Sequence, residues 1–337
     1  MGDKSKHLTY FKVENFKRFE SFEMKDLGQF NLILGDNNVG KTSVLEALLI
    51  NEESRVFINR LFVAIHFRKL KDNIRFGDLE FYSNRNAVVR EKVYSIRFTL
   101  DFKNAVHEEF GLEFDNRNKI RVKGFPNDSS EYSFYDNLGV NSIMNTPFIP
   151  FYKGHDADLT NFYSRLQDNK SLKKSFLKSL KTIVPDLEDI ELSSPYPDSR
   201  PNLIVYQSHI DSSLPLAMFG DGTLKLFRLL AEIVLNRGNR LMIDEIDTGI
   251  YFGRFRQFWK VVLQTAKEFD VQLFMTTHNE ECIRYFKEVI EQDLPELKKD
   301  VRNITLVENA VSKNVTAHTY DFEQFEHAIN VGNEVRA

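Results

Sequence analysis

The residues best suited to do chemistry lie in a glycine-rich segment near the start of the chain. This segment matches the phosphate-loop pattern GxxxxGK[ST] and consists of Gly35, Asp36, Asn37, Asn38, Val39, Gly40, Lys41 and Thr42, followed by Ser43. In such a loop, backbone N–H groups face phosphate oxygens and the following helix adds partial positive charge. We expect Lys41 to bridge the β- and γ-phosphates of a nucleotide and Thr42 to hold Mg²⁺. The alternative is a glycine-rich turn capped by Thr42.

Two adjacent acids follow an apolar segment at 240–243, which predicts a buried strand. Ligands of open α/β sheets bind at the carboxyl ends of the strands, where this segment delivers Asp244 and Glu245. We expect Asp244 to lie just beyond the direct ligands of Mg²⁺ and Glu245 to polarise the attacking water as a general base. Without a phosphate loop on the same sheet, two solvated carboxylates would be the simpler interpretation.

A histidine occupies the same kind of position at the end of another predicted strand, residues 271–275. His278 follows two threonines there, and we expect it to contact the γ-phosphate as a sensor. The alternative is a structural histidine.

A glycine turn precedes the apolar helix predicted at 224–235. Gly220, Asp221 and Gly222 offer free N–H groups and a positive helix end to an anion. The plainer interpretation is an ordinary helix start with Asp221 or Thr223 as the cap.

The remaining patterns indicate the elements that position these residues. Alternating or apolar runs predict strands, whereas amphipathic periodicity predicts helices. We expect strands at 8–14, 19–24, 29–34, 93–102 and 202–206, helices at 44–50, 171–184 and 252–269, and a loop at 126–145. Alternating helices and apolar strands predict an α/β fold with a mostly parallel sheet.

Bulk properties exclude several classes of protein. The net charge of -4 removes the argument from a broadly basic surface for nucleic-acid binding, although a local basic patch is still compatible with it. The single cysteine, Cys282, cannot form an intrachain disulfide, and we find neither a signal peptide nor an apolar run long enough to span a membrane. We therefore expect a cytoplasmic protein without a membrane partner.

The order of these motifs resembles the ABC-type ATPase heads of the RecF, SMC and OLD proteins. It is most similar to small AAA-type ATPases of bacterial anti-phage systems, which pair with a nuclease or TOPRIM-containing partner. The resemblance implies an ABC-ATPase head: a mostly parallel P-loop sheet with flanking helices, N-terminal antiparallel strands and a mixed α+β insertion. We expect a single split domain, with strands and phosphate loop at 1–54, an insertion or partner-binding region at 55–195, and the remaining motifs at 196–337.

The resemblance also assigns roles to individual residues. Lys17 or Arg18 would reach the nucleotide, and the glycine turn would reach across to the γ-phosphate bound by a second copy. Residues 244–249 resemble the Walker B motif and D-loop, and His278 occupies the switch-histidine position. The chain departs from the family at Gly220, where a serine is common, and at Tyr251, where many relatives have His or Asp; no glutamine is assigned to the Q-loop.

Together these features predict a Mg²⁺-dependent ATPase that dimerises around ATP and controls a separate effector. Only 59 residues follow His278, which suggests that any nuclease lies on another chain. A second hypothesis is a DNA repair ATPase of the RecF or SMC kind. Its phosphate contacts would come from two basic groups: Arg68, Lys69, Lys71 and Arg75, and Lys170, Lys174, Lys178 and Lys181. A nucleotide-regulated scaffold without turnover and a P-loop kinase are further alternatives.

Overall fold

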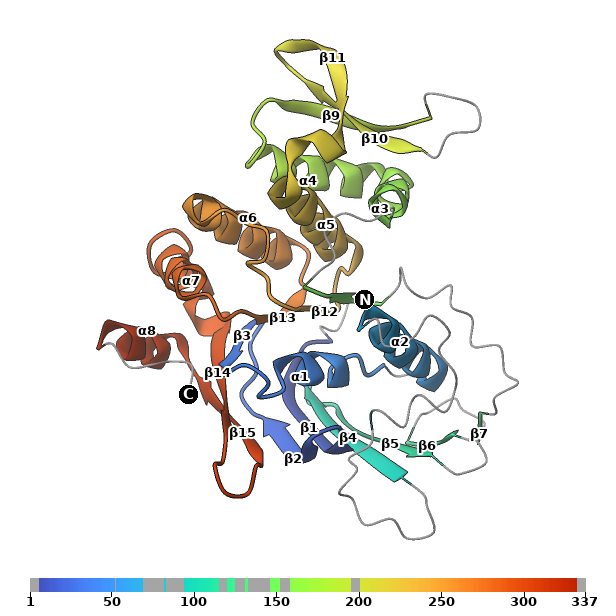
Figure 1. The fold of residues 1–337 in the computed structure, drawn as a ribbon, viewed down its shortest axis with the longest axis vertical. Coiled ribbons are helices and arrows are strands. Elements are labelled where there is room, and N and C mark those ends of the chain that lie inside the picture. Colours follow the sequence, from blue (N-terminus) through green and yellow to red (C-terminus); the bar gives the residue numbers. More distant parts are fainter. Residues whose placement is uncertain are drawn as a thin grey trace.

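The strand that leads into the glycine-rich loop lies inside a six-stranded sheet (Figure 1). Every neighbouring pair in this sheet is parallel except the last two strands of the chain, which form an antiparallel hairpin at one edge. The order is β15 (Val315–Tyr320), β14 (Val301–Glu308), β3 (Phe30–Gly35), β13 (Gln272–Thr276), β12 (Arg240–Ile243) and β8 (Phe148–Ile149). The computed structural model describes residues 6–51, 53–68, 82, 94–114, 120–124, 131–132, 146–151, 158–194 and 201–331.

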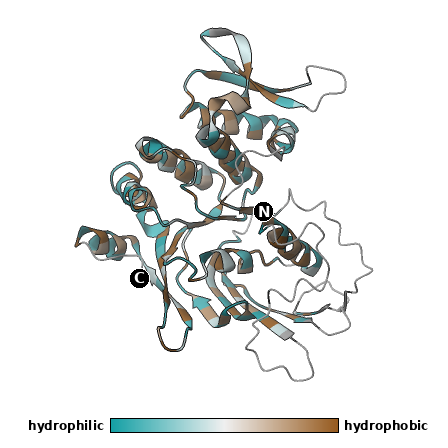
Figure 2. Cartoon of the chain, in the orientation of Figure 1, coloured by the Kyte–Doolittle hydropathy of each residue, from teal (hydrophilic) through white to brown (hydrophobic). Residues whose placement is uncertain are grey.

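Each face of this sheet is buried in a different hydrophobic cluster because side chains alternate along a strand. In β12, Leu241 and Ile243 pack into one cluster, whereas Met242 packs into the other. The first cluster includes residues of α5 (Asp221–Leu235), α6 (Phe255–Glu268) and α7 (Glu280–Gln292). The second includes residues of α1 (Lys41–Ala47) and α2 (Ser54–Phe67). Figure 2 shows hydrophobic residues gathered in the strands and in α2 and α5.

A second, antiparallel sheet packs into the same cluster as α1 and α2. Its β1 pairs with β4, so that segments about 85 residues apart, such as Val13 and Phe98, lie in register. The order is β2 (Phe19–Met24), β1 (Leu8–Phe16), β4 (Tyr94–Phe102), β5 (His107–Phe114), β6 (Ile120–Lys123) and β7 (Glu131–Tyr132). The N-terminal antiparallel strands predicted from the sequence are therefore confirmed, and the middle of the chain extends their sheet.

A third unit projects beyond α5 (Figure 1). It contains two helices and a three-stranded antiparallel sheet in the order β11, β10, β9. Its elements are α3 (Asp158–Gln167), α4 (Lys170–Lys181), β9 (Leu187–Ser193), β10 (Asn202–Gln207) and β11 (Ile210–Pro215). Short 3₁₀ turns at Leu216–Phe219, Phe252–Arg254 and Pro295–Asp300 and the helix α8 (Phe322–Asn330) complete the described elements. Within the described part of the chain, no helix combines the length and apolar content that a membrane span requires.

Two local predictions need correction. Helix α5 begins at Asp221, three residues earlier than its apolar pattern predicts, and its N-cap is Gly220 without a side-chain cap. Asp221 and Thr223 therefore lie inside the helix and do not cap it. Within the segment predicted as loop at 126–145, Glu131–Tyr132 pair with β6, and 126–130 and 133–145 lie outside the described residues.

A buried glutamine joins the two large sheets. The Gln272 side chain donates hydrogen bonds to the carbonyls of Leu8 (2.8 Å) and Gly28 (2.7 Å) and accepts one from the Leu8 N–H (2.8 Å). Gln272 is fully buried at the start of β13, and Leu8 begins β1. These bonds satisfy backbone groups at the margins of both sheets.

Replacing Gln272 by leucine should lower the free energy of unfolding by about 2–4 kcal/mol, because buried backbone groups at Leu8 and Gly28 lose their partners. Urea denaturation measures this loss. The control is Gln264→Leu on the exposed face of α6, which should change stability little. Equal effects of the two substitutions would contradict the role of Gln272.

Candidate functional site

The glycine-rich loop is packed so closely that its first and last glycines have no room for a side chain. A Cβ on Gly35 would lie 2.7 Å from the Leu306 carbonyl oxygen, and one on Gly40 would lie 2.9 Å from the Phe19 ring. Both glycines also have positive φ angles, 143° and 113°. Gly40 is the N-cap of α1, so the helix starts where the sequence predicts a phosphate.

The side chains of the loop divide into exposed and buried groups. Asp36, Asn37 and Asn38 are exposed, whereas Val39 is buried beneath the loop and Ser43 is half-buried in α1. The Lys41 ammonium donates hydrogen bonds to the carbonyls of Gly35 (2.6 Å) and Asp36 (2.9 Å). The lysine thus lies across the loop, where phosphate oxygens could replace carbonyls as its acceptors.

The two basic candidates of the first hairpin have different surroundings. Arg18 donates a hydrogen bond to the Asn38 carbonyl and forms an ion pair with Glu308 of β14, so it contacts the phosphate loop directly. Lys17 instead forms a buried ion pair with Glu46 of α1. Burial lowers the pKa of Lys17 to about 8, against the opposing charge of Glu46. Arg18 is therefore the better placed of the two for a nucleotide.

Asp244 lies between the phosphate loop and the next strand. Its carboxylate accepts hydrogen bonds from the hydroxyls of Thr42 (2.8 Å) and Thr276 (2.7 Å). Burial raises the pKa of Asp244, so its negative charge is costly without a positive partner. The Thr42 hydroxyl and the Asp244 carboxylate are oxygen groups of the kind that Mg²⁺ prefers as ligands. Phosphate oxygens and waters would complete its coordination shell. In the described residues, no cluster of His, Cys, Asp and Glu offers a metal site made of side chains alone.

Glu245 and His278 lie together beyond the carboxyl ends of β12 and β13. Their nearest side-chain atoms, Oε1 of Glu245 and Nδ1 of His278, are 3.8 Å apart. The N–H of Glu245 donates to the Thr276 hydroxyl (2.8 Å), and the Thr248 hydroxyl donates to its carboxylate (3.3 Å). Glu245 also has a positive φ of 46°, an uncommon conformation for this residue type. The turn after β12 therefore holds a carboxylate and an imidazole side by side, both open to solvent.

Lys225 is a buried cation that sequence reasoning did not single out. Its ammonium donates a hydrogen bond to the Glu245 carbonyl (2.8 Å), and Asp247 supplies the main opposing charge. Asp247 in turn accepts a hydrogen bond from Thr277 (2.6 Å). The sequence does contain a signal for this residue, because a lysine interrupts the apolar helix that follows the glycine turn. Lys225 thereby connects α5 with the turn that carries Glu245.

The glycine turn lies on the surface against the residues that follow the acidic pair. Gly220 has a φ of 80°, and a Cβ on Gly222 would lie 3.0 Å from the Gly249 carbonyl oxygen. A cavity of about 310 Å³ is lined by both segments, including Asp221. Exposed hydrophobic side chains flank it: Met218 is 72% exposed, Tyr251 65% and Phe252 49%. The turn is therefore accessible from outside the chain.

The buried lysine makes stability depend on pH. Because burial lowers the pKa of Lys225 from 10.5 to about 8, the folded chain releases this proton at lower pH than the unfolded chain. The free energy of unfolding should therefore rise between pH 8 and pH 10, by about 2 kcal/mol relative to Lys225→Met. The measurement is chemical denaturation of both proteins across this range; parallel curves would contradict the prediction. The buried Lys17 is present in both proteins, so its contribution to the pH dependence cancels in the comparison.

The chain is similar to several known proteins. A family described as "AAA domain, putative AbiEii toxin, Type IV TA system" matches residues 30–284, which include the phosphate loop, the glycine turn, the acidic pair and His278. A Helicobacter pylori protein described as an ATP/GTP phosphatase is 22% identical over 333 residues, covering 83% of this chain and 88% of the relative. The RecF DNA replication and repair protein of Xanthomonas oryzae pv. oryzae is 38% identical over 55 residues, 16% of this chain and 15% of RecF.

Among solved structures, an SMC head bound to the C-winged helix domain of ScpA has a TM-score of 0.59 and 12% identity, covering 95% of this chain and 99% of that one. At this identity the likeness shows the fold alone, a mixed sheet with flanking helices as in SMC heads. Since the family match spans most of the chain, the protein belongs to the family described as "AAA domain, putative AbiEii toxin, Type IV TA system".

Proposed function

We propose that this protein is a Mg²⁺-dependent ATPase that dimerises around ATP and thereby switches a separate effector. The observation that carries the proposal is the chain of contacts from Thr42 through Asp244 and Thr276 to Glu245. These contacts connect the loop that is suited to bind phosphates with the carboxylate of Glu245, which is suited to activate water. A binding module without turnover has no need for such a base.

In this proposal, each step of hydrolysis is assigned to a residue. Lys41 would neutralise the β- and γ-phosphates, and Thr42 and Asp244 would hold Mg²⁺, which supplies charge stabilisation at the phosphates. Glu245 would accept the proton of the attacking water. His278, beside Glu245, would donate a hydrogen bond to the γ-phosphate and thus distinguish ATP from ADP.

The second copy would bring its glycine turn to the γ-phosphate. The exposure of this turn and the apolar side chains of Met218, Tyr251 and Phe252 beside it support a surface that is covered in the dimer. Lys225 offers a route inward, because it joins the helix that starts at the turn to the Glu245 backbone. Closing of the interface and positioning of the base would then be coupled.

The effector is proposed from the resemblance and the family. The description of the family names a toxin and a type IV TA system. The chain also resembles cytoplasmic anti-phage ATPases that act with a nuclease or TOPRIM protein. We therefore place it in bacterial anti-phage defence, with ATP hydrolysis resetting the switch and the effector carried on another chain.

Glu245→Gln should remove the base while leaving nucleotide binding intact. We expect ATP turnover to fall by about 100-fold or more and an ATP-bound dimer to accumulate. Light scattering after size-exclusion chromatography, with and without ATP, measures the dimer. The control, Lys41→Ala combined with Glu245→Gln, should stay monomeric. An ATP-independent size for Glu245→Gln would contradict the proposed switch.

Mixing two inactive variants tests whether the site is shared. Lys41→Ala disables the phosphate loop, and Asp221→Arg at the exposed glycine turn disables the surface offered to the partner. Half of the dimers in an equal mixture contain both chains, and each has one intact composite site, so about a quarter of wild-type ATPase activity should return. A mixture as inactive as its components would show that the turn does not act in trans.

A second candidate function is direct action on DNA, favoured by a row of lysines on α4. Lys170, Lys174, Lys178 and Lys181 are all exposed on this helix, whereas Arg68 is paired with Glu46 and residues 69–75 lie outside the described range. Replacing the four lysines by glutamine should then weaken DNA binding and flatten its salt dependence. Binding measured by fluorescence anisotropy at 50 and 200 mM salt decides this. Affinity unchanged by the substitution assigns these lysines to a solvated helix face.

A further inference from the structure

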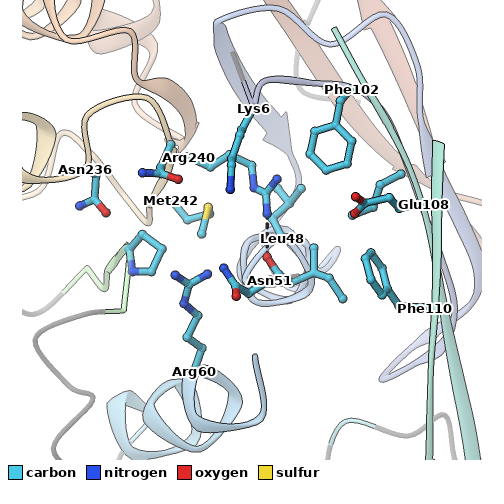
Figure 3. Close-up of a pocket in the computed structure, with 14 residues that line it drawn as sticks. Lys6, Leu48, Asn51, Arg60, Phe102, Glu108, Phe110, Asn236, Arg240 and Met242 are labelled. Carbon is cyan, nitrogen blue, oxygen red and sulfur yellow. Dashed lines mark hydrogen bonds between the residues drawn. The ribbon is translucent and has the colours of Figure 1, made fainter. Parts of the chain in front are cut away.

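A basic cavity lies away from the phosphate loop, at the opposite ends of α1 and β12 (Figure 3). It has a volume of about 120 Å³. Asn51 follows the carboxyl end of α1, whose amino end carries Lys41, and Arg240 begins β12, which ends before Asp244. The lining residues are Lys6, Leu48, Ile50, Asn51, Arg60, Leu100, Phe102, Glu108, Phe110, Pro147, Asn236, Asn239, Arg240 and Met242.

The charges that line the cavity are mostly positive. Lys6, Arg60 and Arg240 contribute cations, and Glu108 contributes the only carboxylate among the lining residues, which leaves a net charge of about two. Figure 3 shows Arg60 entering from α2 and Lys6 from the opposite side. The carboxamides that line the cavity, of Asn51, Asn236 and Asn239, can donate further hydrogen bonds.

Arg60 carries a buried donor that has no partner among the described residues. Its Nε is buried without a hydrogen-bond partner, and its Nη1 donates to the Leu49 carbonyl at 3.3 Å. Burial lowers the pKa of Arg60 to about 10, against the opposing charge of Glu53. A buried guanidinium nitrogen without an acceptor is unfavourable, and an oxygen of a bound anion would remove that cost.

The carbonyls that follow α1 accept one hydrogen bond from each of the two arginines. Arg240 donates to the Ile50 carbonyl at 2.6 Å. A helix carboxyl end carries about half a negative charge, which is less than the net positive charge of the cavity. Helix capping therefore accounts for single hydrogen bonds of the two arginines but not for the unsatisfied Nε of Arg60.

We infer that the basic cavity binds a small phosphorylated molecule, whose phosphate lies among Lys6, Arg60 and Arg240. Guanidinium groups match phosphate oxygens in geometry, and Nε of Arg60 is the donor that such an oxygen would satisfy. Phe102 and Phe110 line the other part of the cavity and offer contacts to the organic part of the ligand. This site is separate from the phosphate loop and does not depend on the function proposed above.

The test uses the full-length Lys41→Ala protein, in which the phosphate loop no longer competes, and isothermal titration calorimetry with pyrophosphate. We expect one site per chain, and at least a tenfold loss of affinity on adding Arg60→Gln. Adding Arg55→Gln, an exposed arginine on the same helix, should leave the affinity unchanged. A second titration with adenosine monophosphate distinguishes the source: tighter binding than pyrophosphate indicates a nucleotide, and weaker binding indicates a free phosphate compound.

A second variant covers the case in which Arg60→Gln does not fold. Asn239→Asp places a negative charge at the exposed rim of the cavity without burying a new group, and it should also weaken pyrophosphate binding at least tenfold. The inference is overturned if Lys41→Ala does not bind pyrophosphate, or if binding is insensitive to the cavity variant that folds. In either case the arginines serve only to cap α1.

Discussion

The hydrogen bonds received by Asp244 hold the candidate site together. One comes from Thr42 in α1, the other from Thr276 at the end of β13, and Asp244 itself follows β12. Three elements from distant parts of the sequence therefore meet at one buried carboxylate. Because burial disfavours its charge, the carboxylate depends on these donors, and a divalent cation would be a stronger partner still. The geometry of the phosphate loop and of Glu245 follows from this arrangement.

Thr276 links this arrangement to Glu245. Its hydroxyl donates to Asp244 and accepts from the Glu245 N–H, so one side chain orders both acids. Glu245 has a left-handed backbone conformation that is uncommon for a residue with a side chain, and the surrounding contacts fix it. From the other side, Lys225 donates to the same residue's carbonyl. The acidic pair is thus held both by the sheet and by the helix that begins at the glycine turn.

The motifs and the order of elements could be predicted from the sequence because each depends on local residue patterns. The phosphate loop needs its glycines within a few residues, and a buried strand is a short apolar run. The choice between Lys17 and Arg18 could not be made, because both precede Phe19 and only tertiary packing turns Lys17 toward Glu46. The pairing of β4 with β1 could not be predicted either, because no local residue pattern specifies the register between strands that are distant in the sequence. Helix α5 starts three residues before its apolar pattern because Gly220 ends the preceding turn. Hydrophobic periodicity gives no information about where that turn ends.

The close approach of Gly222 to the Gly249 carbonyl has a consequence for how the sequence can diverge. A methyl group at Gly222 would lie 3.0 Å from that oxygen, so a side chain there requires the backbone near Gly249 to shift as well. Gly249 has a φ of 80° and itself tolerates few other residues. The two positions, 27 residues apart, therefore both favour glycine, and together they allow the two surface segments to approach closely.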